Sequence, residues 1–524
     1  MTPKPDSTGF FRHADSHRHR TALILSDDTE ISYGALLDRV HRISRVLRQE
    51  GLRRGDGVAA VLPNVPDYLA LQLAADQLGL YFTPVNRHLT AGKVGYVLSD
   101  SGAAVVVTAP RFAGVTAEAA DLAGMAGETR LCFGPATGFI DLDARASASP
   151  PTAPEERSAG AVQFYSSGTT GKPKGIKRPL PDGAPENVYA QIVRNRSEQF
   201  GLRVGDEVSL AVAPLYHSAP NMTAISSLHM GHVVVLAERF DAEKTLQLIE
   251  KHGVTTGFVV PTMFHRMLAL PEEVRRSYDL SSLRVLTHSG ASCPIEVKQA
   301  VLDWLGPVLY EYYGATETGA AVLCTPQEWR EHPGTVGRVV PGYDVKILDE
   351  HGEEQPPGAA GEIYIKGGPS FAYRGKEAET AHQWRGEHFA PGDVGYFDDA
   401  GWLYMCDRRT DLIISGGVNI YPAEIEAVLL SHPAVADAGV IGIPDPEWGH
   451  RVVAVVEPKD DAGRTRLAAE LVDHCRKHLA GFKNPGRIEF APLPRTPTGK
   501  LSRSRLREAY LANAAGSTAT PPDS

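Results

Sequence analysis

Segment 166–175, SSGTTGKPKG, combines hydroxyls, glycines and two lysines, which are groups that hold phosphate oxygens. It departs from the Walker A pattern, because Pro173 stands where that pattern requires its second glycine and neither Lys172 nor Lys174 precedes Ser or Thr. Pro173 also disfavours a helical residue before it, so the segment should not continue directly into a helix. A turn between hairpin strands is the plainer alternative, but it accounts poorly for the paired hydroxyls and lysines. We expect a loop that covers nucleotide phosphates through Ser166, Ser167, Gly168, Thr169, Thr170, Gly171, Lys172 and Lys174.

The composition narrows the class of protein that carries this loop. A chain of 524 residues is long enough for two or more domains, and its 42% hydrophobic and 22% charged residues are typical of a globular protein. The net charge of −10 argues against a nucleic-acid partner. Five widely spaced cysteines favour neither a zinc cluster nor a disulfide framework, and predict a reduced, cytoplasmic setting. No apolar run has the length of a membrane span.

Apolar runs that alternate with helical patterns predict the elements behind the site. They lie at 103–110, 206–214, 232–238, 255–261 and 283–290. This alternation indicates α/β layers with largely parallel sheets, in which ligands bind outside the carboxyl ends of the strands. We expect segment 132–160 to be an exposed connection. The first 20 residues, with His13, His17 and His19, are expected to form a solvated arm without a role.

Five motifs resemble, in order, the signatures of the adenylate-forming superfamily, which includes acyl-CoA synthetases, aryl-CoA ligases, luciferases and nonribosomal adenylation domains. They are SSGTTGKPKG (166–175), YYGATE (312–317), PGDVGYFDDAGWLYMCDR (391–408), IISGGVNIYPAEIE (413–426) and LPRTPTGKLSR (493–503). The resemblance implies a large N-terminal domain (1–408) of layered α/β sheets plus a β-barrel-like subdomain. It also implies a hinge at 409–411, a small mobile α+β C-terminal domain at 412–511, and a disordered tail at 512–524. ATP, Mg²⁺ and coenzyme A are the cofactors and substrates implied.

The resemblance also implies roles for individual residues in the attack of a carboxylate on the α-phosphate of ATP. Glu317 would hold Mg²⁺, Thr316 would donate to a phosphate oxygen, and Lys500 would bridge the attacking carboxylate and the α-phosphate. The alternatives are a surface acid at Glu317 and an ordinary exposed lysine at Lys500. Nucleotide contacts are implied for Ala291, Glu311, Tyr312, Tyr313, Asp393 and Arg408, with Tyr313 stacking on adenine and Asp393 accepting from the ribose.

The second half-reaction needs a thiol to reach the acyl-adenylate. Gly416 and Gly417 are implied to line a channel for the pantetheine arm, because small residues let a thin chain pass close to the backbone. Two positions depart from the family pattern. Thr410 stands at the pivot, where the family more often has Asp or Lys, and Pro391-Gly392 precedes Asp393, where relatives often have Thr.

The acid-binding motif, LYHSAP, begins at Leu215 and has no carboxylate, which argues against an α-amino acid substrate. His217 is implied to border the acyl group, with a hydrogen-bonded core histidine as the alternative. The expected acyl-pocket residues are His217, Ser218, Asn221, Val260, Gly290, Gly314, Ala315 and Ala321. They are mostly small or apolar, and we expect no fixed cation among them for a second carboxylate.

The predicted activity is that of an AMP-forming acyl-CoA ligase for a hydrophobic acid. Medium- or long-chain, aryl and bulky polycyclic acids all stay open at this stage. A ligase that loads an acyl-carrier protein is the alternative within the same chemistry. A non-catalytic acyl or nucleotide sensor and a luciferase-type oxygenase are remote alternatives. The sequence leaves a homodimer open.

Overall fold

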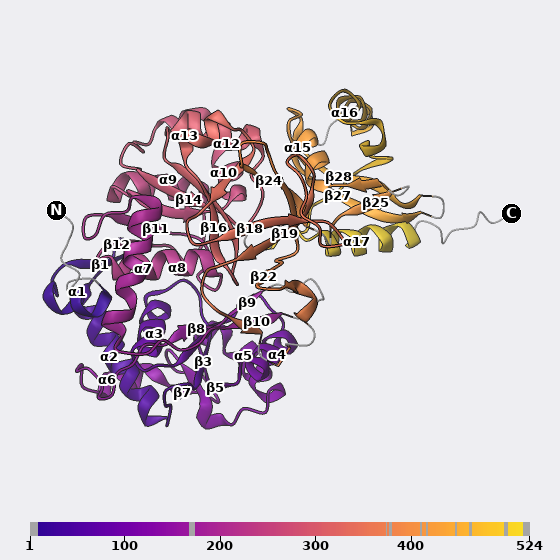
Figure 1. Cartoon of the computed structure of the whole chain (residues 1–524). Helices are drawn as coiled ribbons and strands as arrows, with labels where there is room; N and C mark the ends of the chain where they lie inside the picture. The colour runs from indigo at the N-terminus through magenta and orange to yellow at the C-terminus, as the bar shows by residue number, and fades with distance from the viewer. Residues whose placement is uncertain are drawn as a thin grey trace.

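The computed structural model describes residues 9–166, 173–373, 375–376, 380–408, 411–415, 418–445, 448–460, 464–496 and 501–516. Figure 1 shows two α/β layers, an antiparallel block next to them, and the C-terminal elements in yellow at one side of the molecule. The chain is therefore a mixed α/β protein with a separate C-terminal unit, as the sequence predicted.

The first α/β layer is a parallel sheet of six strands in the order β7-β6-β5-β3-β4-β8. Its strands are β3 (Gly57–Val61), β4 (Tyr81–Pro84), β5 (Ala103–Thr108), β6 (Arg130–Cys132), β7 (Ile140–Asp141) and β8 (Ala161–Val162). Its helices are α2 (Tyr33–Gln49), α3 (Pro66–Gln77), α4 (Ala91–Ser101), α5 (Ala113–Leu122) and α6 (Leu142–Ala148). Every residue of β3 is buried, as expected for a strand covered on both faces.

The second layer contains parallel strands in the order β1-β12-β11-β13-β14-β15. They are β1 (Thr21–Leu25), β11 (Val208–Ala211), β12 (Val233–Leu236), β13 (Thr256–Val259), β14 (Val285–His288) and β15 (Leu309–Ala315), with β2 (Glu30–Ser32) antiparallel at the edge. The associated helices are α7 (Pro185–Phe200), α8 (Ser218–His229), α9 (Ala242–His252), α10 (Pro261–Leu268), α11 (Glu272–Arg276) and α12 (Ile295–Leu305). Because the strands are parallel, their carboxyl ends share one edge of the sheet.

From β15 the sheet continues as an antiparallel block. Its strands are β16 (Gly319–Cys324), β17 (Thr335–Val339), β18 (Asp344–Leu348), β19 (Gly361–Lys366), β21 (Trp384–Arg385), β22 (His388–Phe389), β23 (Asp393–Phe397) and β24 (Leu403–Arg408), and α13 (Pro326–Glu331) joins β16 to β17. This block occupies the place of the expected barrel-like subdomain. Among the residues described, its pairings form an open path from β16 to β21.

In the C-terminal unit, the described residues form a three-stranded sheet, a two-stranded antiparallel pair and three α-helices. They are β25 (Ile413–Ser415), β26 (Val418–Ile420), α15 (Pro422–Leu430), β27 (Val435–Asp445), β28 (Gly449–Pro458), α16 (Arg464–His478), β29 (Arg487–Phe490) and α17 (Arg503–Gly516). Its main core draws only on residues between Ile413 and Phe490. The start of the expected tail is wrong, because the alanine-rich run after 511 continues α17 as far as Gly516. Residues 517–524 lie outside the described part.

Two segments are more ordered than the sequence indicated. Residues 140–148 of the supposed connection add β7 to the sheet edge and form α6, which buries Leu142 and Ala146. The supposed solvated arm contains α1 (Phe10–Ser16), where Phe10, Phe11 and His13 are buried. Both differences have the same cause. A short helix or strand needs only a few apolar residues to pack on a larger neighbouring element, and so few residues give no clear pattern in the sequence. No helix in the described ranges is long and apolar enough to cross a membrane.

Candidate active site

The shared carboxyl edge of β11, β13, β14 and β15 gathers most of the predicted acyl-pocket residues. His217 directly precedes α8, Val260 directly precedes α10, and Gly290 follows β14 in a left-handed conformation (φ 87°). Ser218 Oγ and Thr316 Oγ1 lie 3.0 Å apart, which joins the start of α8 to the turn after β15. The ring centroids of His217 and Tyr216 are 4.6 Å apart. Segments a hundred residues apart in sequence thus meet at one edge.

Glu317 lies in the tight turn between the antiparallel strands β15 and β16. Its side chain is buried, with 6% of the residue exposed, and the Tyr373 hydroxyl donates a hydrogen bond to Oε1 over 2.7 Å. Burial raises the pKa of Glu317, while the Tyr373 hydrogen bond and the nearby Arg178 and Lys174 oppose that shift. A buried carboxylate gains from a cation beside it, so this environment suits a divalent ion such as Mg²⁺.

The Glu317 turn is fixed from β10 (Lys174–Lys177) and the residue after it. Arg178 Nη2 donates to the carbonyl oxygen of Thr316 over 2.7 Å and to that of Glu317 at 3.4 Å. On the next strand, β20 (Ala372–Tyr373), Tyr373 pairs with Ile176 of β10. The strands that flank the glycine-rich segment therefore also position the predicted metal ligand.

The glycine-rich segment connects β9 (Phe164–Ser166) to β10, which are antiparallel with Lys174 opposite Ser166. The expectation that the segment does not run into a helix is therefore confirmed. The alternative of a turn between hairpin strands also predicted the antiparallel pairing of β9 and β10. Residues 167–172 lie outside the described residues. Lys174, predicted to contact phosphate, is buried, and its Nζ donates to Gln383 Oε1 over 3.2 Å.

The end of the glycine-rich segment is tied to the first layer. The carbonyl oxygen of Pro173 accepts from the hydroxyl of Tyr96 at 3.2 Å and from Lys376 Nζ at 3.4 Å. Lys376 also lies 3.3 Å from Asp100, which accepts from the Tyr165 hydroxyl over 2.8 Å. These contacts fix where the segment rejoins the sheet.

The predicted nucleotide residues Tyr313 and Asp393 are brought together. The Tyr313 hydroxyl donates to Asp393 Oδ2 over 3.0 Å, and Asp393 stands opposite Arg408 in the β23–β24 pair. Gly314 is required by space, because a Cβ there would lie 1.8 Å from the carbonyl oxygen of Gly319. The side chain of Arg408 lies outside the described part of the structure.

The two residues before Tyr313 have other surroundings than expected. Glu311 is buried and forms an ion pair with Lys298, so its carboxylate is engaged inside the protein. Tyr312 points away from Tyr313, as alternation along a strand requires, and its ring lies 6.0 Å from that of Phe200 on α7. Ala291 is partly exposed just after Gly290.

Two of the expected acyl-pocket residues are core residues instead. Asn221 is fully buried, and its amide exchanges hydrogen bonds with Gln72 at 2.7 and 3.1 Å and donates to the Tyr68 hydroxyl at 3.0 Å. Ala321 is also fully buried, in the apolar cluster of the antiparallel block. Each lies on the inward side of its element, which the motif alone does not reveal. Ala315 stays partly exposed at the edge.

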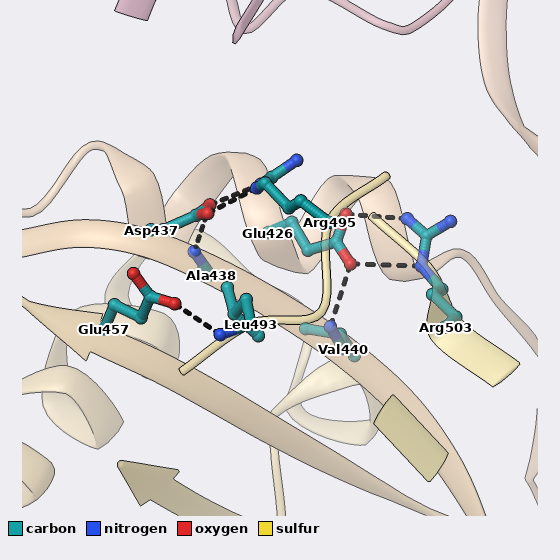
Figure 2. Close-up of polar contacts among 8 residues, drawn as sticks. All are labelled: Glu426, Asp437, Ala438, Val440, Glu457, Leu493, Arg495 and Arg503. Carbon is teal, nitrogen blue, oxygen red and sulfur yellow. Dashed lines mark hydrogen bonds and ion pairs between the residues drawn. The ribbon is translucent and has the colours of Figure 1, made fainter. Parts of the chain in front are cut away.

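Lys500 and its neighbours 497–499 lie outside the described residues, but the chain on either side of them is anchored (Figure 2). Arg495 forms an ion pair with Asp437, and the Leu493 amide donates to Glu457. Beyond the gap, Arg503 Nη2 donates to Glu426 Oε2 over 2.6 Å. Residues 495 and 501 also form an isolated β-bridge, which closes the loop that carries Lys500.

Gly416, Gly417 and Thr410 likewise lie outside the described residues, so the predicted thiol channel and pivot stay predictions. Sequence reasoning missed several residues that shape the site. They are Tyr373, Arg178 and Lys376. Arg178 was accessible in principle as a charged residue just after a predicted motif. Tyr373 and Lys376 lie between motifs, and their partners come from distant segments.

Comparison with known proteins shows the family to which the chain belongs. The family model described as AMP-binding enzyme matches residues 10–372, and the model for the AMP-binding enzyme C-terminal domain matches residues 424–500. A feruloyl-CoA synthase from Amycolatopsis sp is 38% identical over 506 residues, which are 95% of this chain and 98% of that protein.

Two further proteins are similar over nearly their whole length. A fatty acid–[acyl-carrier-protein] ligase from Streptomyces coeruleorubidus is 31% identical over 515 residues, which are 95% of each chain. The structure of o-succinylbenzoate CoA synthetase from Bacillus subtilis, in complex with its acyl-adenylate intermediate, matches with a TM-score of 0.80 and 29% identity. That match covers 97% of this chain and 99% of the other.

Proposed function

We propose that this chain, which belongs to the AMP-binding enzyme family and is an acid–thiol ligase that uses ATP, Mg²⁺ and coenzyme A, activates a hydrophobic carboxylic acid. Aryl acids are the first class to test, because a feruloyl-CoA synthase and an o-succinylbenzoate CoA synthetase are among its relatives. Medium- or long-chain and polycyclic acids are the other members of the proposed substrate range.

The observation that carries the proposal is the meeting of Glu317, Thr316 and Ser218 at the carboxyl edge of the parallel strands. We assign Thr316 to a phosphate oxygen, Asp393 and Tyr313 to the nucleoside, and Lys500 to the attacking carboxylate and the α-phosphate. Glu317 would hold Mg²⁺, which neutralises phosphate charge when bound. The positions of these groups support this assignment without testing it.

The chemistry proceeds in two displacements. In the first, a carboxylate oxygen attacks the α-phosphorus of ATP, and the bond to pyrophosphate breaks. In the second, the thiolate of coenzyme A attacks the acyl carbon, and AMP leaves with the oxygen that linked it to the acyl group. The protein contributes positioning and charge neutralisation, which suit a reaction between two anions. We place His217, beside the acyl group, on the route of the thiol, and Gly416 and Gly417 along the channel.

The proposal is tested by exchange of labelled pyrophosphate into ATP. We expect exchange that depends on an aryl acid and is lost in Lys500→Ala. Lys477→Ala, which changes an exposed lysine on α16, is the matched control and should exchange normally. Normal exchange in Lys500→Ala would contradict the role of Lys500, and no exchange with any acid would contradict the substrate class.

A second candidate is loading of an acyl-carrier protein, which the similarity to the Streptomyces coeruleorubidus ligase favours. Both candidates share the first displacement and differ in the thiol. Mass spectrometry of the product formed with coenzyme A alone separates them. Acyl-CoA supports the first candidate, whereas release of AMP only when a carrier protein is supplied supports the second.

A further inference from the structure

Arg196, near the end of α7, is a cation that has no acidic partner among the residues that the structure describes. Its Nη2 donates to Thr223 Oγ1 over 2.9 Å and its Nε donates to Ser226 Oγ over 3.3 Å, both on α8. Within the described residues these are its hydrogen bonds, and no carboxylate pairs with it. Burial lowers the pKa of Arg196, although part of its surface stays accessible. Arg196 is therefore enclosed by protein without being sealed from solvent.

Thr223 and Ser226 position the guanidinium without neutralising it. The Thr223 hydroxyl donates to the carbonyl oxygen of Ala219 at 3.0 Å, and the Ser226 hydroxyl donates to that of Thr223 at 3.1 Å. Each hydroxyl therefore gives its proton to the helix and offers only lone pairs to Arg196. The guanidinium also lies 5.1 Å from the ring centroid of Phe200, which holds it from a second side.

Lys298 and Lys174 are the buried lysines among the described residues. Lys298 pairs with Glu311, whereas Lys174, which is predicted to contact phosphate, donates to the neutral amide oxygen of Gln383. A buried charge without a partner is costly, and proteins retain such groups mostly where a ligand supplies the opposite charge. Arg196 is thus a cation whose partner is not provided by the described chain.

The contacts that Arg196 makes with α8 indicate how far it lies from the site proposed for the acid's carboxylate. Ser218, at the start of α8, touches Thr316, and the partly exposed Ala219 and Met222 follow on the same side of the helix. Thr223 and Ser226 come next along that stripe, about 8 and 12 Å from Ser218 at 1.5 Å per residue. If the reacting carboxylate of an acid lies near Thr316, a group on the same acid that is separated from that carboxylate by about one aromatic ring would therefore reach Arg196.

We propose that Arg196 is a specificity-determining residue at the far end of the acyl pocket, where it binds a negatively charged oxygen carried by the acid about one ring from the reacting carboxylate. This inference rests on the proposed function. It departs from the expectation that the pocket contains no fixed cation for a second carboxylate. Its chemistry is the charge-assisted hydrogen bond between a guanidinium and an oxygen anion, which a second carboxylate makes best and a phenolic oxygen makes more weakly.

The test compares cinnamic, 4-hydroxycinnamic and 4-carboxycinnamic acid, which share one skeleton and differ at the far end. Acid-dependent pyrophosphate release gives kcat/KM for each acid with the wild type, Arg196→Met and Arg196→Lys. Arg194→Gln changes an exposed arginine two residues earlier on α7 and is the matched control. We expect the wild type and the control to prefer the 4-carboxy acid. Arg196→Met should lose that preference by tenfold or more while it keeps activity on cinnamic acid.

Arg196→Lys retains the positive charge but lacks the planar pair of N–H donors of the guanidinium, and it should show an intermediate preference. The inference is overturned if the ratio between the 4-carboxy and unsubstituted acids stays at the wild-type value in whichever Arg196 variant still uses cinnamic acid. It is also overturned if the wild type prefers the unsubstituted acid. A preference for the 4-hydroxy acid that Arg196→Met abolishes identifies the phenolic oxygen as the group bound. Absence of pyrophosphate release by the wild type with all three acids contradicts the proposed function instead.

Discussion

Arg503 Nη1 donates to Asp411 Oδ2 across 2.8 Å, which links the residue at the start of α17 to the predicted hinge. The same guanidinium donates to Glu426 on α15 through Nη2 and Nε, at 2.6 and 3.1 Å. Arg503 is therefore held by acids from two segments, and it follows Lys500 by three residues. Asp411, in the predicted hinge, and the chain that follows Lys500 are thus linked through this one side chain.

Replacement of Arg503 by glutamine should slow adenylation. The glutamine side chain is shorter and uncharged, so Asp411 and Glu426 lose their shared partner and the chain beside Lys500 loses its anchor. Because small misplacements of a reacting group are costly, we expect pyrophosphate exchange to fall by on the order of tenfold to a hundredfold, with ATP affinity little changed. Arg505→Gln, at an exposed position of α17, is the control. Equal exchange rates in the two variants would show that the anchor is dispensable.

Tyr373→Phe should move the acid limb of the pH profile upward. The Tyr373 hydroxyl donates to Glu317 and lowers its pKa, against the burial that raises it. Without that donor the pKa of Glu317 rises further, so the carboxylate is protonated, and unable to hold Mg²⁺, at a higher pH. The measurement is kcat/KM for ATP from pH 5 to 9 at several Mg²⁺ concentrations.

Two variants complete that test. Tyr278→Phe removes a hydroxyl that donates to Glu243 away from the site, and its profile should match the wild type. Glu317→Gln should lose activity by on the order of a hundredfold or more at every pH. An acid limb that does not move in Tyr373→Phe would mean that Glu317 does not control it.

Tyr313→Phe should raise KM for ATP by roughly twofold to tenfold, the range expected for one hydrogen bond. The lost hydroxyl donates to Asp393 and so orients the predicted ribose acceptor. We expect kcat to change less than KM, because the contact is made before and during the reaction alike. Steady-state kinetics with varied ATP at saturating acid give both values. A fall in kcat with unchanged KM would contradict a role in holding the nucleoside.

Asp76→Asn should stabilise the protein, increasingly so as the pH rises. Asp76 on α3 is 2% exposed, and burial raises its pKa to about 7. Between about pH 4 and 7 the unfolded state loses this proton and the native state keeps it, so the wild type loses stability as the pH rises. At about 1.4 kcal/mol per unit, the loss is at most about 4 kcal/mol.

The check on Asp76 is the melting temperature of both proteins at pH 5, 6, 7 and 8. The gain from Asp76→Asn should be small at pH 5 and largest at pH 8. Asp303→Asn changes an exposed carboxylate and should give no such trend. A gain that is independent of pH would mean that Asp76 is ionised in the native state.

The sequence predicted the parallel layers well, because strands buried on both faces read as unbroken apolar runs, as β3 and β5 show. It also predicted residues that contact each other at the carboxyl edge, such as Ser218 and Thr316, since parallel topology brings those ends together. Short elements such as α1 and α6 were missed because they carry few apolar residues and depend on the neighbours that cover them.

What the sequence could not supply was the direction of individual side chains. Glu311, Asn221 and Ala321 each stand beside or within the expected site but face the core. Tyr373 and Arg196 were not predicted, because nothing near them in sequence marks them. Their hydrogen-bond partners lie 56 and 27–30 residues away. Such contacts follow from register and packing between segments, which a pattern read along one chain does not contain.

The central claim, that the acid is activated as its adenylate, is tested most directly with a carboxylate labelled with ¹⁸O at both oxygens. The substrate is any acid that supports pyrophosphate release, supplied with ATP, Mg²⁺ and coenzyme A. We expect AMP that carries one ¹⁸O atom, unlabelled pyrophosphate, and acyl-CoA that retains the other label. Label in pyrophosphate or inorganic phosphate, with unlabelled AMP, would contradict it.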